Sequence, residues 1–156
     1  MANSTWFVLT VMLLLGAGCA GDDAVRGPSL EAEGGWVRAM PLLADGAGSG
    51  SNSAAYMVIK NRGDELDRLV GVESPVAGRV EVHETRMVDD VMRMRLLGEL
   101  DLPPGDSVKL VPGGIHVMFV GLTRALLEGD SVELTLRFGT SDPLVLNLPV
   151  RLMGEG

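Results

Sequence analysis

Two residue types that bind soft metal ions are concentrated in one stretch of this chain. The sequence has two histidines, His83 and His116, and nine methionines. Four of the methionines fall within residues 83–118, namely Met87, Met92, Met94 and Met118. Thioether sulfur and imidazole nitrogen together favour Cu(I), whereas Ca²⁺ and Mg²⁺ require oxygen ligands. The stretch therefore predicts a site for a monovalent copper ion.

Alternating patterns of apolar residues place these side chains on strand surfaces. In residues 115–120 the odd positions are apolar, so His116 and Met118 share the opposite face of one strand. In residues 79–86 the valines face the core, and His83 points away from it. Both histidines and at least one methionine are thus expected to leave the core on strand surfaces that could adjoin.

Several other chemistries lack the residues that they need. The single cysteine, Cys19, excludes an internal disulfide framework and a Cys-x-x-Cys site. Structural zinc sites usually recruit thiolates, and blue-copper electron-transfer sites require one. Phosphate-loop and nucleophile-elbow motifs are absent, and the acidic pairs Asp22-Asp23 and Asp89-Asp90 are typical of solvated linkers and turns. The net charge of −8 argues against nucleic-acid binding. A binding protein is expected, not an enzyme.

The spacing of the candidate ligands matches a known pattern. His83, Met94, His116 and Met118 follow the order His-x10-Met-x21-His-x-Met. This order resembles the ligand motif of the periplasmic copper chaperone family called PCuAC, and the resemblance covers about residues 34–151. Other stretches that look like the family are Trp36-Val37-Arg38, Ala54-Ala55-Tyr56-Met57, Val80-Glu81-Val82-His83-Glu84 and Pro112-Gly113-Gly114-Ile115-His116-Val117-Met118.

The resemblance implies a cupredoxin-like β-sandwich with an exposed Cu(I) site, whose ligands are His83, Met94, His116 and Met118. It also implies delivery of copper toward the binuclear copper centre of cytochrome c oxidase, often alongside a thioredoxin-like copper assembly protein. Some family members carry a second site on a His/Met-rich tail, which residues 151–156 do not resemble. One Cu(I) per domain is expected, because the sequence contains one such group of ligands, and the protein is expected to be a monomer.

Most of the chain reads as short strands between turns. Seven segments have strand patterns: 54–59, 79–86, 91–97, 107–111, 115–120, 131–138 and 144–150. This spacing predicts an all-β fold, an antiparallel sandwich or barrel. Residues 122–128 could form a helical turn, and 46–53 are a Gly/Ser-rich loop. Parity places Met92 beside Met94, and Met87 near a turn is a candidate transient ligand.

The N-terminal residues are typical of an export signal. The apolar run from Trp6 to Leu15 is too short to span a bilayer but matches a secretory signal peptide. The run is followed by Gly-Ala-Gly and Cys19, which resembles a lipoprotein signal with a lipidated cysteine. No Lys or Arg precedes Arg26, and Gly16 stands where leucine is usual, so plain cleavage or an uncleaved anchor remains open.

These patterns divide the chain into three parts. We expect a signal peptide at 1–19, a flexible tether at 20–33, and a copper-binding β-sandwich at 34–152. The protein is placed in the periplasm or cell envelope, with a possible membrane attachment at Cys19. Two alternatives to a delivery role remain open: copper buffering or storage, and a metal-free scaffold or adhesion domain. A copper titration of the mature domain distinguishes the metal-free alternative.

Overall fold

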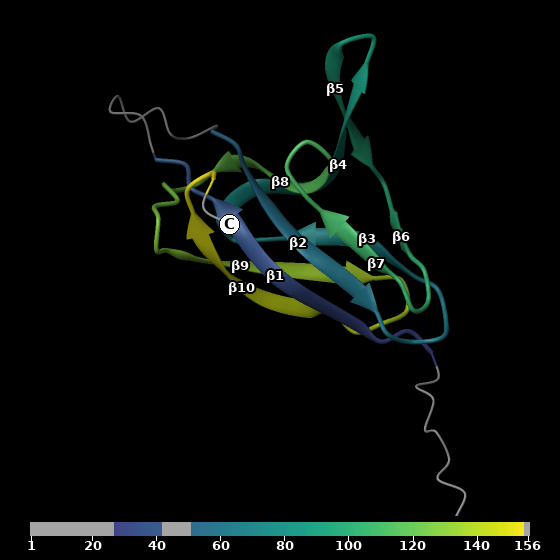
Figure 1. The fold of residues 1–156 in the computed structure, drawn as a ribbon. Helices are drawn as coiled ribbons and strands as arrows, with labels where there is room; N and C mark the ends of the chain where they lie inside the picture. The colour runs from purple at the N-terminus through teal and green to yellow at the C-terminus, as the bar shows by residue number, and fades with distance from the viewer. Residues whose placement is uncertain (1–26, 42–50, 155–156) are drawn as a thin grey trace, which may run out of the picture.

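The computed structural model describes residues 27–41 and 51–154, and these form ten strands and no helix. The all-β fold class is thus confirmed (Figure 1). The strands are β1 (Leu30–Arg38), β2 (Ser53–Asn61), β3 (Asp67–Glu73), β4 (Ala77–Val88), β5 (Val91–Leu97), β6 (Leu100–Leu102), β7 (Ser107–Leu110), β8 (Ile115–Leu122), β9 (Ser131–Phe138) and β10 (Leu144–Arg151). The described part of the chain contains no helix that could cross a membrane.

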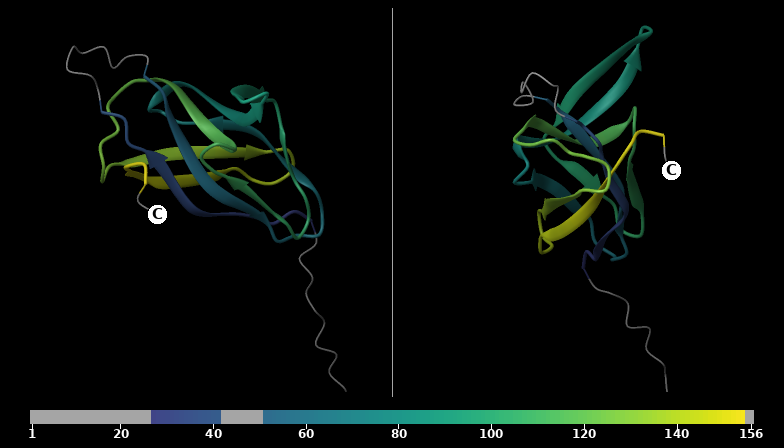
Figure 2. Two further views of the ribbon diagram at one scale, coloured as in Figure 1. Left: turned by 45° about the horizontal axis from the view of Figure 1, so that its top comes forward. Right: turned by 90° about the vertical axis from the view of Figure 1, so that its left-hand side faces the viewer.

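The strands follow one continuous order that folds back on itself around the core. The order is β5-β4-β8-β2-β1-β10-β9-β3-β6, with β7 also paired to β2. One pairing is parallel, between β1 and β10, where Val37 lies opposite Val150. The sheet is therefore mixed, not purely antiparallel as the sequence predicted. The ribbon views show how the strands wrap around a common interior (Figure 2). Fully buried side chains such as Ile59, Phe119 and Leu134 belong to the core.

The domain begins earlier than the sequence predicted. Strand β1 starts at Leu30 and pairs with β2, so residues 30–33 belong to the sheet and not to a tether. An ion pair joins the two strands, because Oε2 of Glu33 on β1 lies 2.6 Å from Nζ of Lys60 on β2. The predicted signal peptide, Cys19 and residues 20–26 lie outside the described residues.

The segment that could have formed a helical turn is extended instead. Strand β8 continues to Leu122, and an isolated bridge pairs Leu126 with Met40. The chain then turns at residues 128–129 before β9. The prediction of a helical turn at residues 122–128 was wrong, because this segment finds its backbone partners in other parts of the fold.

Strands β4 and β5 form a hairpin that projects from one edge of the sheet (Figures 1 and 2). Its turn consists of Asp89 and Asp90, with φ angles of 51° and 59°. Aspartate tolerates this left-handed conformation better than most residues, and a two-residue turn of this kind suits the strand twist. Near the base of the hairpin, the buried Glu84 carboxylate contacts Arg86 and Arg95, each at 2.6 Å. The turn and these ion pairs hold the register of the hairpin.

Candidate metal centre

The four predicted ligands lie on one face of three neighbouring strands. His83 of β4 is directly opposite His116 of β8. Met94 of β5 lies opposite Thr85, two positions along from His83, and Met118 lies two positions along from His116. Residues that are directly opposite, or two apart on a strand, share a face of the sheet. The fold therefore brings all four side chains to the face that looks away from the core.

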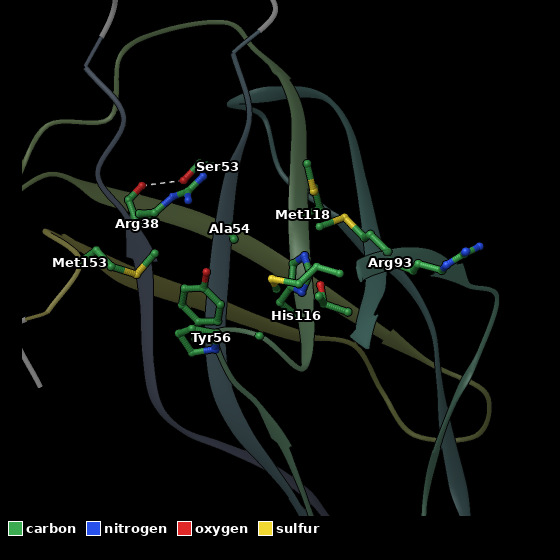
Figure 3. Close-up of a pocket in the computed structure, with 13 residues that line it drawn as sticks. Arg38, Ser53, Ala54, Tyr56, Arg93, His116, Met118 and Met153 are labelled. Carbon is green, nitrogen blue, oxygen red and sulfur yellow. Dashed lines mark hydrogen bonds between the residues drawn. The ribbon is translucent and has the colours of Figure 1, made fainter. Parts of the chain in front are cut away.

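Three of these side chains line one cavity of about 310 Å³. The three are Met94, His116 and Met118, and Tyr56 lines the same cavity (Figure 3). His83 is not part of this lining, but its ring centroid lies 6.1 Å from that of His116. Met94 is 52% exposed, so the cavity opens toward the hairpin. An ion bound here would have access to solvent from one side.

His116 is more deeply buried than its position in the alternating pattern suggests. Only 5% of the residue is exposed, although it lies on the outer face of the sheet. Tyr56 covers it with a centroid separation of 6.4 Å, and Trp36 packs on Tyr56 at 4.7 Å. Burial lowers the pKa of His116, and its hydrogen bond to Gly114 opposes this only in part. The imidazole is therefore neutral at pH 7, which is the form that binds metals.

The hydrogen bond of His116 leaves one ring nitrogen free. Its Nδ1 lies 3.1 Å from the carbonyl oxygen of Gly114. Because a carbonyl only accepts, Nδ1 carries the proton and Nε2 keeps its lone pair. The same carbonyl accepts the backbone N–H of Thr85 at 3.1 Å, which ties the turn before β8 to β4. The preceding Gly113 has a φ of 75°, a conformation that suits glycine.

In His83 the hydrogen bond is made by Nε2, so Nδ1 is the free ring nitrogen. Its Nε2 lies 2.9 Å from Oε2 of Glu81, and a carboxylate also only accepts. The proton is thus on Nε2, while Nδ1 is buried and has no hydrogen-bond partner. A buried acceptor without a partner costs free energy, and a bound metal ion would satisfy it. The sequence could have indicated Glu81, because it lies two residues before His83 on the same strand face.

Thioethers must supply the remaining donors of any soft-metal site here. Among residues 27–41 and 51–154, no group of three or more His, Cys, Asp or Glu side chains could hold a metal ion. The histidines offer two nitrogens, and Met94 and Met118 offer two sulfurs. Arg38 also lines the cavity, and its charge is expected to disfavour a highly charged cation. This arrangement suits a monovalent, soft ion.

Comparison with known proteins gives a family match over most of the chain. The family model described as "Putative lipoprotein LpqE-like" matches residues 30–150. A relative from Leifsonia xyli subsp. xyli, "Putative lipoprotein Lxx21020", is 32% identical over 143 residues. That match covers 89% of this chain and 84% of the relative.

Solved structures that this chain resembles include PCuAC domains. The copper-bound PCuAC domain from PmoF2 is 27% identical with a TM-score of 0.63, and the match covers 79% of this chain and 92% of that domain. The solution structure of Cu(I)-DR1885 from Deinococcus radiodurans is 28% identical with a TM-score of 0.62, covering 89% of this chain and 87% of that one. Both structures are thus similar to this chain in fold and, at more than a quarter of aligned positions, in sequence.

Proposed function

The chain belongs to the LpqE-like family and has the cupredoxin-like fold of PCuAC domains, and from this premise we propose that it is an extracytoplasmic copper chaperone. In this proposal it carries one Cu(I) ion as cargo and is not an enzyme. Two solved neighbours are described as copper-bound, one of them with Cu(I). The family description and the Leifsonia relative both name a lipoprotein, which supports a place in the cell envelope.

The proposed ligands are Nδ1 of His83, Nε2 of His116 and the sulfurs of Met94 and Met118. The observation that carries this assignment is the buried Nδ1 of His83, which has no hydrogen-bond partner and lies on the same face as the other three side chains. Glu81 and Gly114 fix the proton on the opposite nitrogen of each ring. Two neutral thioethers and two neutral imidazoles leave the ion its single charge, which favours Cu(I) over Cu(II).

The site is built to release its ion as well as to bind it. No cysteine occurs among the described residues, so no thiolate holds the ion by charge. Met94 is half-exposed, so one ligand can be replaced from outside. We propose that the ion passes to the copper-bearing subunit of cytochrome c oxidase, a step that rests on the resemblance to PCuAC proteins.

An anaerobic Cu(I) competition titration against a chromophoric chelator tests the binding site. The mature protein should bind one equivalent tightly. H83A and M118L should each weaken Cu(I) affinity by more than the roughly 10–100-fold that removal of an outer hydrogen-bond partner costs at a metal site. M153L is the matched control, because Met153 is exposed and lines the same cavity but lies outside the spaced motif. Wild-type affinity in M118L or H83A would remove that residue from the site.

A transfer experiment distinguishes delivery from buffering. The Cu(I)-loaded protein is mixed with the apo copper domain of an oxidase, or with a small chelator of matched affinity. A direct hand-over makes transfer to the oxidase domain faster than transfer to the chelator, and makes its rate depend on oxidase concentration. Equal rates set only by dissociation would favour copper buffering.

A further inference from the structure

We propose that Met87 and Met92 form a second, exposed site for a soft monovalent cation at the outer end of the β4–β5 hairpin. The two residues lie directly opposite each other in the hairpin register. They are 65% and 62% exposed. This inference rests on the proposed function, because it assumes that the protein meets Cu(I) as its cargo.

The geometry of the pair suits two-thioether binding. Residues directly opposite in an antiparallel pair have Cβ atoms about 4.5–5.5 Å apart on the same face. Methionine has three rotatable side-chain bonds, so the two sulfurs can converge on one ion from either side. Their exposure leaves room for this movement without displacing core residues.

The pair continues the line of sulfur atoms that starts in the cavity. Met92 itself lines the cavity beside Met94, and both lie on the same face of β5. Residues two apart on a strand are separated by about 6.5–7 Å along it. Thioether donors are therefore available from Met118, through Met94 and Met92, to Met87 near the turn. A cation held by Met87 and Met92 lies one strand repeat from the proposed primary site.

The charged residues next to the pair leave the choice of ion to the sulfurs. Asp89 and Asp90 form the turn just after Met87, and Arg86 and Arg93 lie opposite each other one position further from the turn. These two acidic and two basic residues balance in charge, whereas the neutral sulfurs select soft cations. The turn also fixes Met87 opposite Met92.

The residue types on the hairpin distinguish a metal site from a plain docking surface. Six large apolar side chains of the hairpin are exposed: Met87, Val88, Val91, Met92, Met94 and Leu96. Met87, Met92, Met94 and Leu96 share one face, whereas Val88 and Val91 lie on the other. An exposed apolar surface usually has a function. Leucine or valine would be sufficient for docking alone. On the face that carries Met94, the opposed pair nearest the turn is Met87 and Met92, and both are methionine. This favours thioether chemistry at the pair.

Methionine methyl NMR during a silver titration tests the second site. Ag(I) is a soft, redox-stable monovalent probe, and the mature protein carries 13C-labelled methionine methyl groups assigned by single Met→Leu variants. The first equivalent should shift the Met94 and Met118 methyl signals. The second should shift those of Met87 and Met92 together. In M87L the second equivalent should no longer shift Met92, although leucine keeps the apolar surface.

The outcomes separate this inference from the proposed function. M40L is the control and should keep both steps, because Met40 neither lines the cavity nor belongs to a strand of the hairpin. If Met94 and Met118 respond while Met87 and Met92 do not, the second site is wrong and the chaperone proposal stands. If Met94 and Met118 fail to respond, the proposed primary site is wrong, and the Met87 and Met92 signals still decide the second site. A full Met92 response in M87L would also overturn the pair.

Discussion

At the residue scale, the two neighbouring histidines keep different ring nitrogens free of a hydrogen bond. The hydrogen bond to Glu81 places the ring proton of His83 on Nε2, whereas the hydrogen bond to Gly114 places that of His116 on Nδ1. Each partner only accepts a hydrogen bond, so each fixes both the tautomer and the orientation of its ring. In the proposed copper site, the geometry of the two imidazole ligands would thus depend on Glu81 and Gly114, which are not themselves proposed as ligands.

Glu81 is predicted to be a positioning residue for His83. E81A removes the acceptor, so the His83 ring gains rotational freedom and the proton can move to Nδ1. Cu(I) affinity should fall about 10–100-fold in E81A. E81Q should lose less, because its amide oxygen still accepts from Nε2–H. Competition titration measures the affinity, and 15N chemical shifts of His83 report its tautomer. Unchanged affinity together with an unchanged tautomer in E81A would contradict this role.

Cu(I) affinity should depend on pH through the histidines. A ligating nitrogen must be free of its proton, while thioethers do not titrate. Burial lowers the pKa of His116, so this ligand stays available below pH 6.5, where an ordinary histidine is half protonated. Affinity should be constant from pH 8 to 7 and fall below about pH 6, with at most two protons taken up per ion released. A titration series that stays flat down to pH 5 would show that the histidines are not ligands.

The sequence indicated which residue types share a face, but not how deeply they lie. Strand alternation predicted that His116 and Met118 point away from Val117, and the register agrees. Alternation has no information about what covers the outer face. His116 is buried because Tyr56 of a neighbouring strand lies over it. That contact joins residues 60 positions apart and leaves no local signal.

At the element scale, regular strands were predictable and irregular ones were not. The segments 91–97 and 131–138 were predicted with the bounds that the structure has. Strand β3 was missed, because a register shift between Leu69 and Gly71 interrupts its alternation. Strand β6 has only three residues, too few for a pattern. The parallel pairing of β1 with β10 joins the two ends of the domain, which no local pattern reveals.

Asp67 is predicted to stabilise the start of β3 and the loop before β10. Its Oδ1 accepts from the N–H groups of Arg68 at 2.7 Å and Thr140 at 3.0 Å, and its Oδ2 accepts from Ser141 N–H at 2.9 Å. D67N replaces one acceptor by a donor, and loss of a hydrogen bond to a charged group costs about 2 kcal/mol. Urea unfolding at pH 7 should show that the free energy of unfolding falls by about this amount, and a decrease of less than about 0.5 kcal/mol would contradict the prediction.

The same residue predicts a sensitivity to acid. Burial raises the pKa of Asp67, but its hydrogen bonds to Ser141, Arg68 and Thr140 outweigh burial, so the pKa is lowered. The unfolded chain therefore binds a proton near pH 4 while the folded chain does not. This stabilisation is present above about pH 4 and is lost as the pH falls through the lowered folded-state pKa. Between pH 5 and 3, D67N should lose less unfolding free energy than the wild type.

At the scale of the whole molecule, the two ends of the domain have different neighbours. Strand β1 starts at the end opposite the β4–β5 hairpin (Figures 1 and 2). Gly27 is bound there, because its N–H donates to Asp64 Oδ1 at 2.7 Å. Eight residue steps separate Cys19 from Gly27, and they span at most about 29 Å. A lipid anchor at Cys19 would therefore keep the end of the domain that carries Gly27 within this distance of the membrane.

Membrane attachment through Cys19 is the last prediction. The wild-type protein should fractionate with membranes and incorporate a labelled lipid, and C19S should be released or incorrectly processed. Cu(I) affinity should be the same in both, because all four proposed ligands lie on β4, β5 and β8. M118L is the reciprocal control, since it should weaken Cu(I) binding and leave lipid labelling unchanged. If the wild-type protein is soluble, unlabelled and begins after residue 20, the anchor is wrong. The domain would then have no fixed distance limit to the membrane, while the proposed copper site would be unaffected.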